Sequence, residues 1–143
     1  MKRFAGDLGC TSYRLHRAAL AASRFYERHM AGSGLGMAQF ALLSTMHDLH
    51  GSTVTDIAEA IGLERTTLTR NLETLKKRRL IAVAEGRDGR TRAVHLTNQG
   101  REAFQKALPF WKKAQSLMSK TLGPAFLKRL HGELEIAIEK MPE

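Results

Sequence analysis

Six polar side chains are concentrated in one short stretch of the chain. They are hydroxyl, amide and guanidinium groups, which hydrogen-bond base edges and phosphates when a helix enters the DNA major groove by its N-terminal end. The six are Arg65, Thr66, Thr67, Thr69, Arg70 and Asn71. We interpret them as candidates for a DNA-reading surface.

The stretch 64–79 that contains them has the spacing of an amphipathic helix. Three leucines recur at i, i+4 and i+7 and therefore share one side, while Thr66, Arg70 and Glu73 fall on the opposite side. The basic run 76–79 suits the negative end of the helix dipole and could also reach the DNA backbone. The leucines that would pack inward are Leu68, Leu72 and Leu75.

A shorter helix is expected directly before this one, at residues 53–61. Ala58, Gly62 and Leu68 give the spacing A-x3-G-x5-L. In this spacing the small residue lets two helices approach, the glycine permits a tight turn, and the leucine locks the second helix on the first. The pattern predicts a helix-turn-helix in which 64–79 is the recognition helix.

The pattern changes from helical to extended after Leu80. Residues 81–85 and 91–96 are strand candidates joined by a turn at 86–90. A basic hairpin directly after a recognition helix is a wing, and arginine is favoured in a narrow minor groove. Alone, the same hairpin would be interpreted as an ordinary solvated turn. Its candidate DNA contacts are Arg87, Asp88, Arg90 and Arg92.

Single residues predict where the other helices begin and end. Gly51 is expected to cap the helix before it, and Thr53 and Asp56 have the spacing of a capping box for the helix after it. Thr97 is expected to cap a long helix that Pro109 kinks. The last helix is predicted to begin at residues 123–124.

The winged helix-turn-helix needs only residues 37–97, so the helices expected within 8–31 and 98–141 have apolar stripes that this module cannot cover. An intertwined homodimer built from both ends of the chain would cover them. We therefore predict a mainly α fold with a small β wing, and a dimer that binds a pseudo-palindromic site with half-sites about one helical turn apart.

Charge is distributed unevenly along the 143 residues, whose formal net charge is +9. Residues 64–92 contain nine basic and four acidic groups, a balance that favours a polyanion such as DNA. We expect the basic residues of 93–143 simply to solvate helix faces. No apolar run is long enough to span a bilayer, so a cytoplasmic protein is the simplest interpretation.

The whole chain resembles the MarR family of transcriptional regulators. The resemblance implies a dimeric winged helix-turn-helix, usually a repressor that small ligands or oxidation release from DNA. It also implies that Asp88 orders the wing while Arg90 enters the minor groove. The matching segments are residues 24–27, 39–43, 63–72, 88–90, 94–97 and 100–101.

Two positions depart from the family pattern. Gly36 stands where a threonine or serine cap often precedes the second helix, which predicts a looser helix start. Peroxide sensors of the family place a cysteine fourteen residues before a tyrosine, a count that leads from Tyr26 to Ser12 rather than to Cys10. Two residues are about 200° around a helix, which argues against a thiol switch at Cys10 but leaves an oxidation-responsive regulator as an alternative.

A small-molecule effector pocket is a further expectation, lined by His16, Arg17, Met46 and Trp111. Such a pocket would suit an aromatic anion, although core and interface packing explains these residues equally well. His47 and His50 are three residues apart, but this pair lacks the additional ligands that a metal site needs. We predict no metal, no cofactor and no catalytic centre, and we retain a sequence-neutral architectural DNA-binding protein as an alternative.

Overall fold

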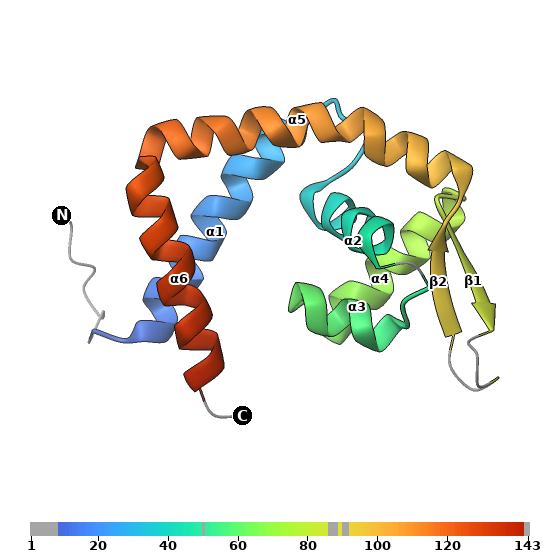
Figure 1. Ribbon diagram of the computed structural model, residues 1–143, viewed down its shortest axis with the longest axis horizontal. Helices are drawn as coiled ribbons and strands as arrows, with labels where there is room; N and C mark the ends of the chain where they lie inside the picture. The colour runs from blue at the N-terminus through green and yellow to red at the C-terminus, as the bar shows by residue number, and fades with distance from the viewer. Residues whose placement is uncertain (1–8, 50, 86–88, 90–91, 142–143) are drawn as a thin grey trace.

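The computed structural model describes residues 9–49, 51–85, 89 and 92–141 (Figure 1). Helices α1 and α6 lie below the left half of the long helix α5, with α6 continuing from its C-terminal end, and α2, α3, α4 and a β-hairpin lie below its right half (Figure 1). This confirms the predicted mainly α fold with a small hairpin. The elements are α1 (Thr11–Met30), α2 (Met37–Asp48), α3 (Val54–Ile61), α4 (Arg65–Lys77), β1 (Ile81–Glu85), β2 (Arg92–Leu96), α5 (Asn98–Leu122) and α6 (Pro124–Lys140).

The core lies where α2, α3 and α4 meet, and it is closed within the single chain. Leu42 and Leu43 of α2, Ile57 of α3, and Leu68 and Leu75 of α4 are all 0% exposed. Burying a side chain of this size contributes about 1.5–3 kcal/mol relative to leaving it in water. The leucine spacing of α4 therefore sets which side of the helix packs and which side remains available.

Local helix signals act as predicted at several positions. The Thr53 hydroxyl accepts a hydrogen bond from the Asp56 N–H at 3.1 Å, and the Asp56 carboxylate accepts one from the Thr53 N–H at 2.9 Å. Gly62 follows α3 with φ 68°, a left-handed conformation that glycine adopts without steric cost. The Thr97 hydroxyl accepts from the Gly100 N–H at 3.0 Å, and α5 continues through Pro109 as one helix.

The predicted glycine cap of α2 is wrong. The helix ends at Asp48 with Leu49 at the cap position, and Gly51, with φ 71°, lies in the turn beyond it. The Ser52 hydroxyl donates to the Leu49 carbonyl at 2.6 Å, which satisfies an acceptor that the helix no longer pairs. The Ser52 carbonyl then accepts a hydrogen bond from the Val94 N–H of β2. The chain therefore leaves the helix at Asp48, before Gly51, and Ser52 pairs with β2.

The recognition helix is also shorter than the predicted 64–79. Arg78 is its cap residue, and Arg79 adopts a left-handed conformation with φ 59°. The Leu80 N–H reaches back to the Leu75 carbonyl at 3.0 Å, and the Arg79 N–H bonds the Lys76 carbonyl at 2.9 Å, which is the Schellman pattern. This turn directs Leu80, which is 6% exposed, into the core.

The start of α2 has a cap that sequence reasoning did not anticipate. Gly36 has no side chain to cap the helix, but Glu27 of α1 accepts a hydrogen bond from the Met37 N–H at 3.0 Å. A carboxylate is favoured at a helix N-terminus because it satisfies an unpaired N–H and meets the positive end of the dipole. The interaction fastens α1 to the DNA-binding module.

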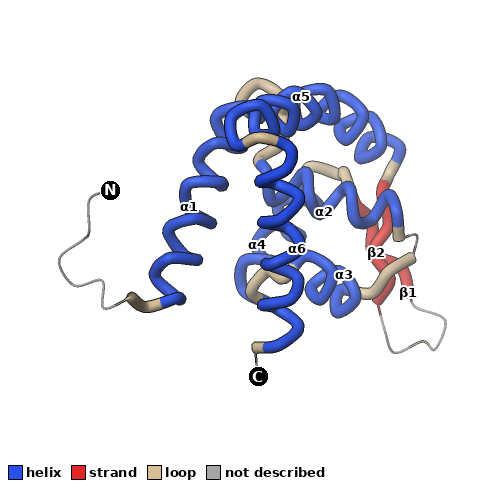
Figure 2. The backbone as a smooth tube through the Cα atoms, turned by 60° about the vertical axis from the view of Figure 1, so that its left-hand side comes forward, coloured by secondary structure: helices blue, strands red, loops and turns tan. Residues whose placement is uncertain are grey.

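The outer helices bury little within one chain. Among the described residues of α1 and α6, only Met30 and Leu127 are buried. Larger apolar side chains are open to solvent, including Ile136 at 47% and Ile138 at 65% exposed. Both views place α1 away from the hairpin (Figures 1 and 2). No helix within the described residues is long and apolar enough to cross a membrane.

Candidate nucleic-acid interface

Helix α4 presents its predicted reading residues unequally. Leu68 and Leu75 bury one side of the helix, which turns the opposite side outward. Thr67 and Asn71 lie at the edge of the packed side and are half-buried. The exposed candidates are Arg65, Thr66, Thr69 and Arg70.

Hydrogen bonds within α4 separate these residues further. The Thr69 hydroxyl donates to the Arg65 carbonyl at 2.9 Å, and the Asn71 amide donates to the Thr67 carbonyl at 2.9 Å. Thr69 is left with only acceptor capacity, and Asn71 keeps one of its two amide hydrogens. Arg65 and Arg70 therefore have the most donor capacity available for a ligand, and the exposed Thr66 has a single hydroxyl donor.

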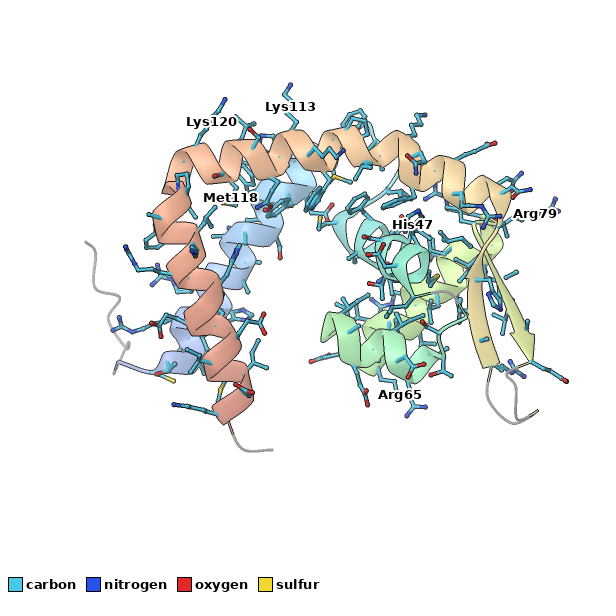
Figure 3. The ribbon with its side chains drawn as sticks, viewed as in Figure 1. His47, Arg65, Arg79, Lys113, Met118 and Lys120 are labelled. Atoms are coloured by element: carbon cyan, nitrogen blue, oxygen red, sulfur yellow. The ribbon has the colours of Figure 1, made fainter. Side chains whose placement is uncertain are left out.

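The reading residues and the hairpin lie toward one side of the molecule. Arg65 projects from the side opposite α5, and the far ends of β1 and β2 extend in the same direction (Figure 3). The last described pair of the hairpin is Glu85 opposite Arg92, and Arg92 is exposed. A duplex lying along this side would meet both α4 and the hairpin.

The hairpin is braced against the helix-turn-helix. Its strands pair antiparallel with Val83 opposite Val94, and Val94 is buried. The other edge of β2 pairs with the segment before α3, through a bridge between Thr53 and Ala93 and the bond from the Val94 N–H to the Ser52 carbonyl at 2.9 Å. The same segment caps α3, so the position of the hairpin is tied to that of α3.

A groove of about 180 Å³ separates α4 from the hairpin. Its floor is apolar, and its polar rim combines the cations Lys76 and Arg92 with Glu73 and Thr69. Glu73 is the acidic residue of this rim and lies in the second half of α4. It would repel phosphate there, which leaves the first two turns of the helix as the favourable part for contact with DNA.

Arg78 has a structural role that the sequence did not reveal. Its guanidinium donates to the Gly34 carbonyl at 2.9 Å and to the Gln39 side chain at 3.2 Å. These partners lie in and after the α1–α2 loop, so Arg78 fastens the end of α4 to the start of α2. The predicted basic run is thereby divided: Lys76 and Lys77 remain exposed, and Arg78 is engaged.

Three predicted wing contacts, Arg87, Asp88 and Arg90, lie outside the described residues. Their assignment continues to rest on the sequence.

The four predicted effector residues do not lie together in the single chain. Met46 is 2% exposed in the core, and the Trp111 ring stacks on Phe40 with centroids 5.9 Å apart. His16 and Arg17 are exposed on the N-terminal half of α1, which lies away from α2 (Figures 1 and 2). Any pocket that uses all four would need a further element, such as a second copy of the chain.

Other candidate chemistry is sparse in the described part of the chain. No group of three or more histidine, cysteine, aspartate or glutamate side chains there could hold a metal ion. His47 contacts Asp48 at 3.2 Å and packs its ring on Phe104. Burial raises the pKa of Tyr26, whose hydroxyl donates a hydrogen bond to the Gln115 side chain. Cys10 is exposed and directly precedes α1.

Comparison with known proteins yields one family. The model of the MarR family matches residues 33–91. The chain is similar to M. tuberculosis transcriptional regulator MosR in complex with DNA, at 38% identity, with 91% of this chain and 96% of that chain covered and a TM-score of 0.77. A second structure of MosR shows 35% identity, coverage of 96% and 100%, and a TM-score of 0.80.

A third similar structure is Bordetella bronchiseptica BpsR, described for the regulation of its DNA binding by 6-hydroxynicotinic acid. It is 25% identical, with 88% of this chain and 96% of that chain covered and a TM-score of 0.77. None of the curated proteins matches this chain. The identity to MosR over nearly the full length, together with the family match across the helix-turn-helix, shows that the chain belongs to the MarR family of transcriptional regulators.

Proposed function

We propose that this protein is a homodimeric repressor that acts in the cytoplasm, binds a pseudo-palindromic operator, and is released by a small-molecule effector. The observation that carries the proposal is the outward side of α4, where Arg65, Thr66 and Arg70 are exposed and their side-chain donors could reach bases and phosphates. The braced hairpin beside α4 would contribute Arg92 and, beyond the described residues, Arg87, Asp88 and Arg90.

Dimerisation is supported by the exposed apolar side chains of α1 and α6. Ile136 and Ile138 lie near the end of α6, and Leu20 on α1 is 42% exposed. A second copy of the chain would cover these residues and present two α4 helices to adjacent major grooves.

Effector release is supported by hydrogen bonds that connect α1 to α4 through the start of α2. Glu27 links α1 to the first N–H of α2, and Arg78 links the end of α4 to the residues beside that N–H. A ligand that binds better to a dimer with a different placement of α1 would therefore shift α4 as well, and DNA would be released by population shift. The regulation of BpsR by 6-hydroxynicotinic acid supports an aromatic, anionic effector.

The decisive experiment compares wild-type protein with Arg70→Ala on duplexes selected from a random pool. We expect the substitution to weaken binding to the selected operator by about 1–3 kcal/mol and to relax sequence choice at the base that Arg70 contacts. Arg70→Lys is the matched control, since it keeps the charge but loses the bidentate fork.

The outcome separates this proposal from a sequence-neutral architectural role. A repressor should prefer its operator to random DNA by roughly 10³-fold or more, whereas an architectural protein should show a steep salt dependence with little preference. Equal weakening of Arg70→Ala on every duplex would show that Arg70 contacts only phosphate.

A further inference from the structure

A second basic surface lies on the side of the molecule opposite the reading surface. Residues 103–132 contain six basic residues and no acidic residue. Lys113 and Lys120 project outward from α5, away from the body of the molecule and from Arg65 on the opposite side (Figure 3). Lysines that were expected only to solvate a helix therefore share one outer surface.

The geometry of α5 sets these lysines in a row. Lys106, Lys113 and Lys120 are spaced seven residues apart, so each lies about 20° around the helix from the one before. At 1.5 Å per residue the row is about 21 Å long. All three side chains are exposed, and so is Lys112 beside them. The nearest acidic residue of α5 is Glu102, one turn before Lys106 and outside the row.

The surface lacks the features that would favour a protein or a membrane. Between residues 98 and 121, all of which are described, no large hydrophobic side chain is exposed; the first is Leu122 at the end of the helix. Protein interfaces are centred on buried aromatic and apolar anchors, and membrane-surface helices need an apolar face. The residues exposed between the lysines are Pro109 and Ser116, and they provide neither a large apolar anchor nor an apolar face.

We propose that the row Lys106, Lys113 and Lys120 binds the phosphate backbone of a second DNA duplex, so that one protein holds two DNA segments on opposite sides. Duplex DNA carries about one negative charge per 1.7 Å of axis, and a segment as long as the row therefore offers several phosphates to each lysine. Lysine is a point charge without base-reading geometry. Binding at the row is therefore sequence-neutral and sensitive to salt.

The test uses the full-length protein with its reading surface disabled by Arg65→Ala and Arg70→Ala, so that the second surface is measured without any operator. Binding of a labelled random-sequence duplex is followed as a function of salt, with and without Lys106→Gln, Lys113→Gln and Lys120→Gln. We expect the three glutamines to weaken binding at least tenfold and to lower the salt slope by up to about 2.7, or about 0.9 per lost phosphate contact. Lys→Arg at the same three positions preserves the charge and should preserve binding.

A second measurement adds the three glutamines to the otherwise wild-type chain. Its affinity for a short selected operator should stay within twofold, while capture of a second duplex by the operator-bound protein should be lost. Unchanged random-duplex affinity and salt slope would refute the second surface, whatever the fate of operator recognition. Stronger competition by polyglutamate than by DNA, compared at equal charge concentration, would assign the row to an acidic protein instead.

Discussion

The DNA-binding module and the outer helices α1 and α6 differ in how much of their apolar surface is buried within one chain. The core of the module is closed within one chain, with Leu43, Ile57 and Leu75 completely buried and with Phe104 and Ala107 of α5 packed into it. Helices α1 and α6 leave large apolar residues open, with Ile138 at 65% exposed. The difference shows that one chain buries the side of α4 opposite its proposed reading residues, whereas α1 and α6 leave apolar surface that the proposed dimer would cover. On that proposal, recognition and assembly would be carried by separate parts of the chain.

The largest expected effect tests the joint between the hairpin and α5. A methyl group added at Gly100 would lie 2.0 Å from the Leu80 carbonyl oxygen, a backbone atom that cannot withdraw. We expect Gly100→Ala to destabilise the protein by about 3 kcal/mol or more, measured by chemical denaturation. Gly132→Ala in α6 is the control: a methyl there meets nothing within 4 Å, and helix propensity predicts a gain of about 0.5–1 kcal/mol. A loss at Gly132 would mean that a partner packs closely against α6.

Removing a core side chain should lower the stability of the protein. Leu75 is 0% exposed, and Leu75→Ala should cost about 2–5 kcal/mol through lost burial and the cavity that remains. Circular dichroism during urea unfolding measures the loss. Little change in stability would show that the core of the module is not the main source of its folding free energy.

Polar substitution of the exposed face of α6 should affect assembly rather than folding. Ile136 and Ile138 are 47% and 65% exposed in one chain, so covering that remainder is worth about half of full burial, roughly 0.7 kcal/mol or more for each side chain. Ile136→Ser with Ile138→Ser removes this contribution at both positions of both copies. We therefore expect the dissociation constant of the dimer to rise at least about 100-fold, as measured by sedimentation. A variant that stays dimeric at the same concentrations would contradict the assignment of α6 to the interface.

The smallest effect concerns the capping box of α3. Hydrogen bonds from the backbone and side chain of Thr53 hold the pKa of Asp56 below its ordinary value. The folded pKa is thus lower than the unfolded one, so the stabilisation is present above the unfolded pKa and is lost as pH falls through the folded pKa. In thermal unfolding, the midpoint temperature of the wild type should exceed that of Asp56→Asn at pH 7. The difference between the two midpoint temperatures should narrow toward pH 3. A difference that stays the same from pH 7 to pH 3 would contradict this role of the ionised Asp56.

Much of the module could be predicted because its signals are local. The capping pair Thr53 and Asp56, the left-handed Gly62 and the cap at Thr97 each act within a few residues of their own position. The leucine spacing of α4 likewise predicted the packed side of the helix and, by elimination, the reading side. The DNA-contact roles of the hairpin residues, Arg92 included, remain predictions, as does the effector pocket.

The errors have a common cause in contacts between distant segments. The sequence predicts that Gly51 ends α2, but α2 ends earlier, at Asp48, and Ser52 pairs with β2. Arg78 was assigned to a basic run that could reach DNA, but its partners lie 39 and 44 residues away along the chain. Glu27 received no role, because nothing near it in the sequence indicates that it caps another helix.

The sequence by itself determined the order of the elements, the helix-turn-helix and the side of α4 that faces outward, because periodicity and capping depend on neighbouring residues. The tertiary structure decided which polar groups remain available for DNA. It engaged Arg78 with the start of α2, tied α1 to α2 through Glu27, and separated the lysines of α5 from the reading surface. Those outcomes depend on which surfaces meet in space, and no local pattern encodes the approach of residues so far apart in the chain.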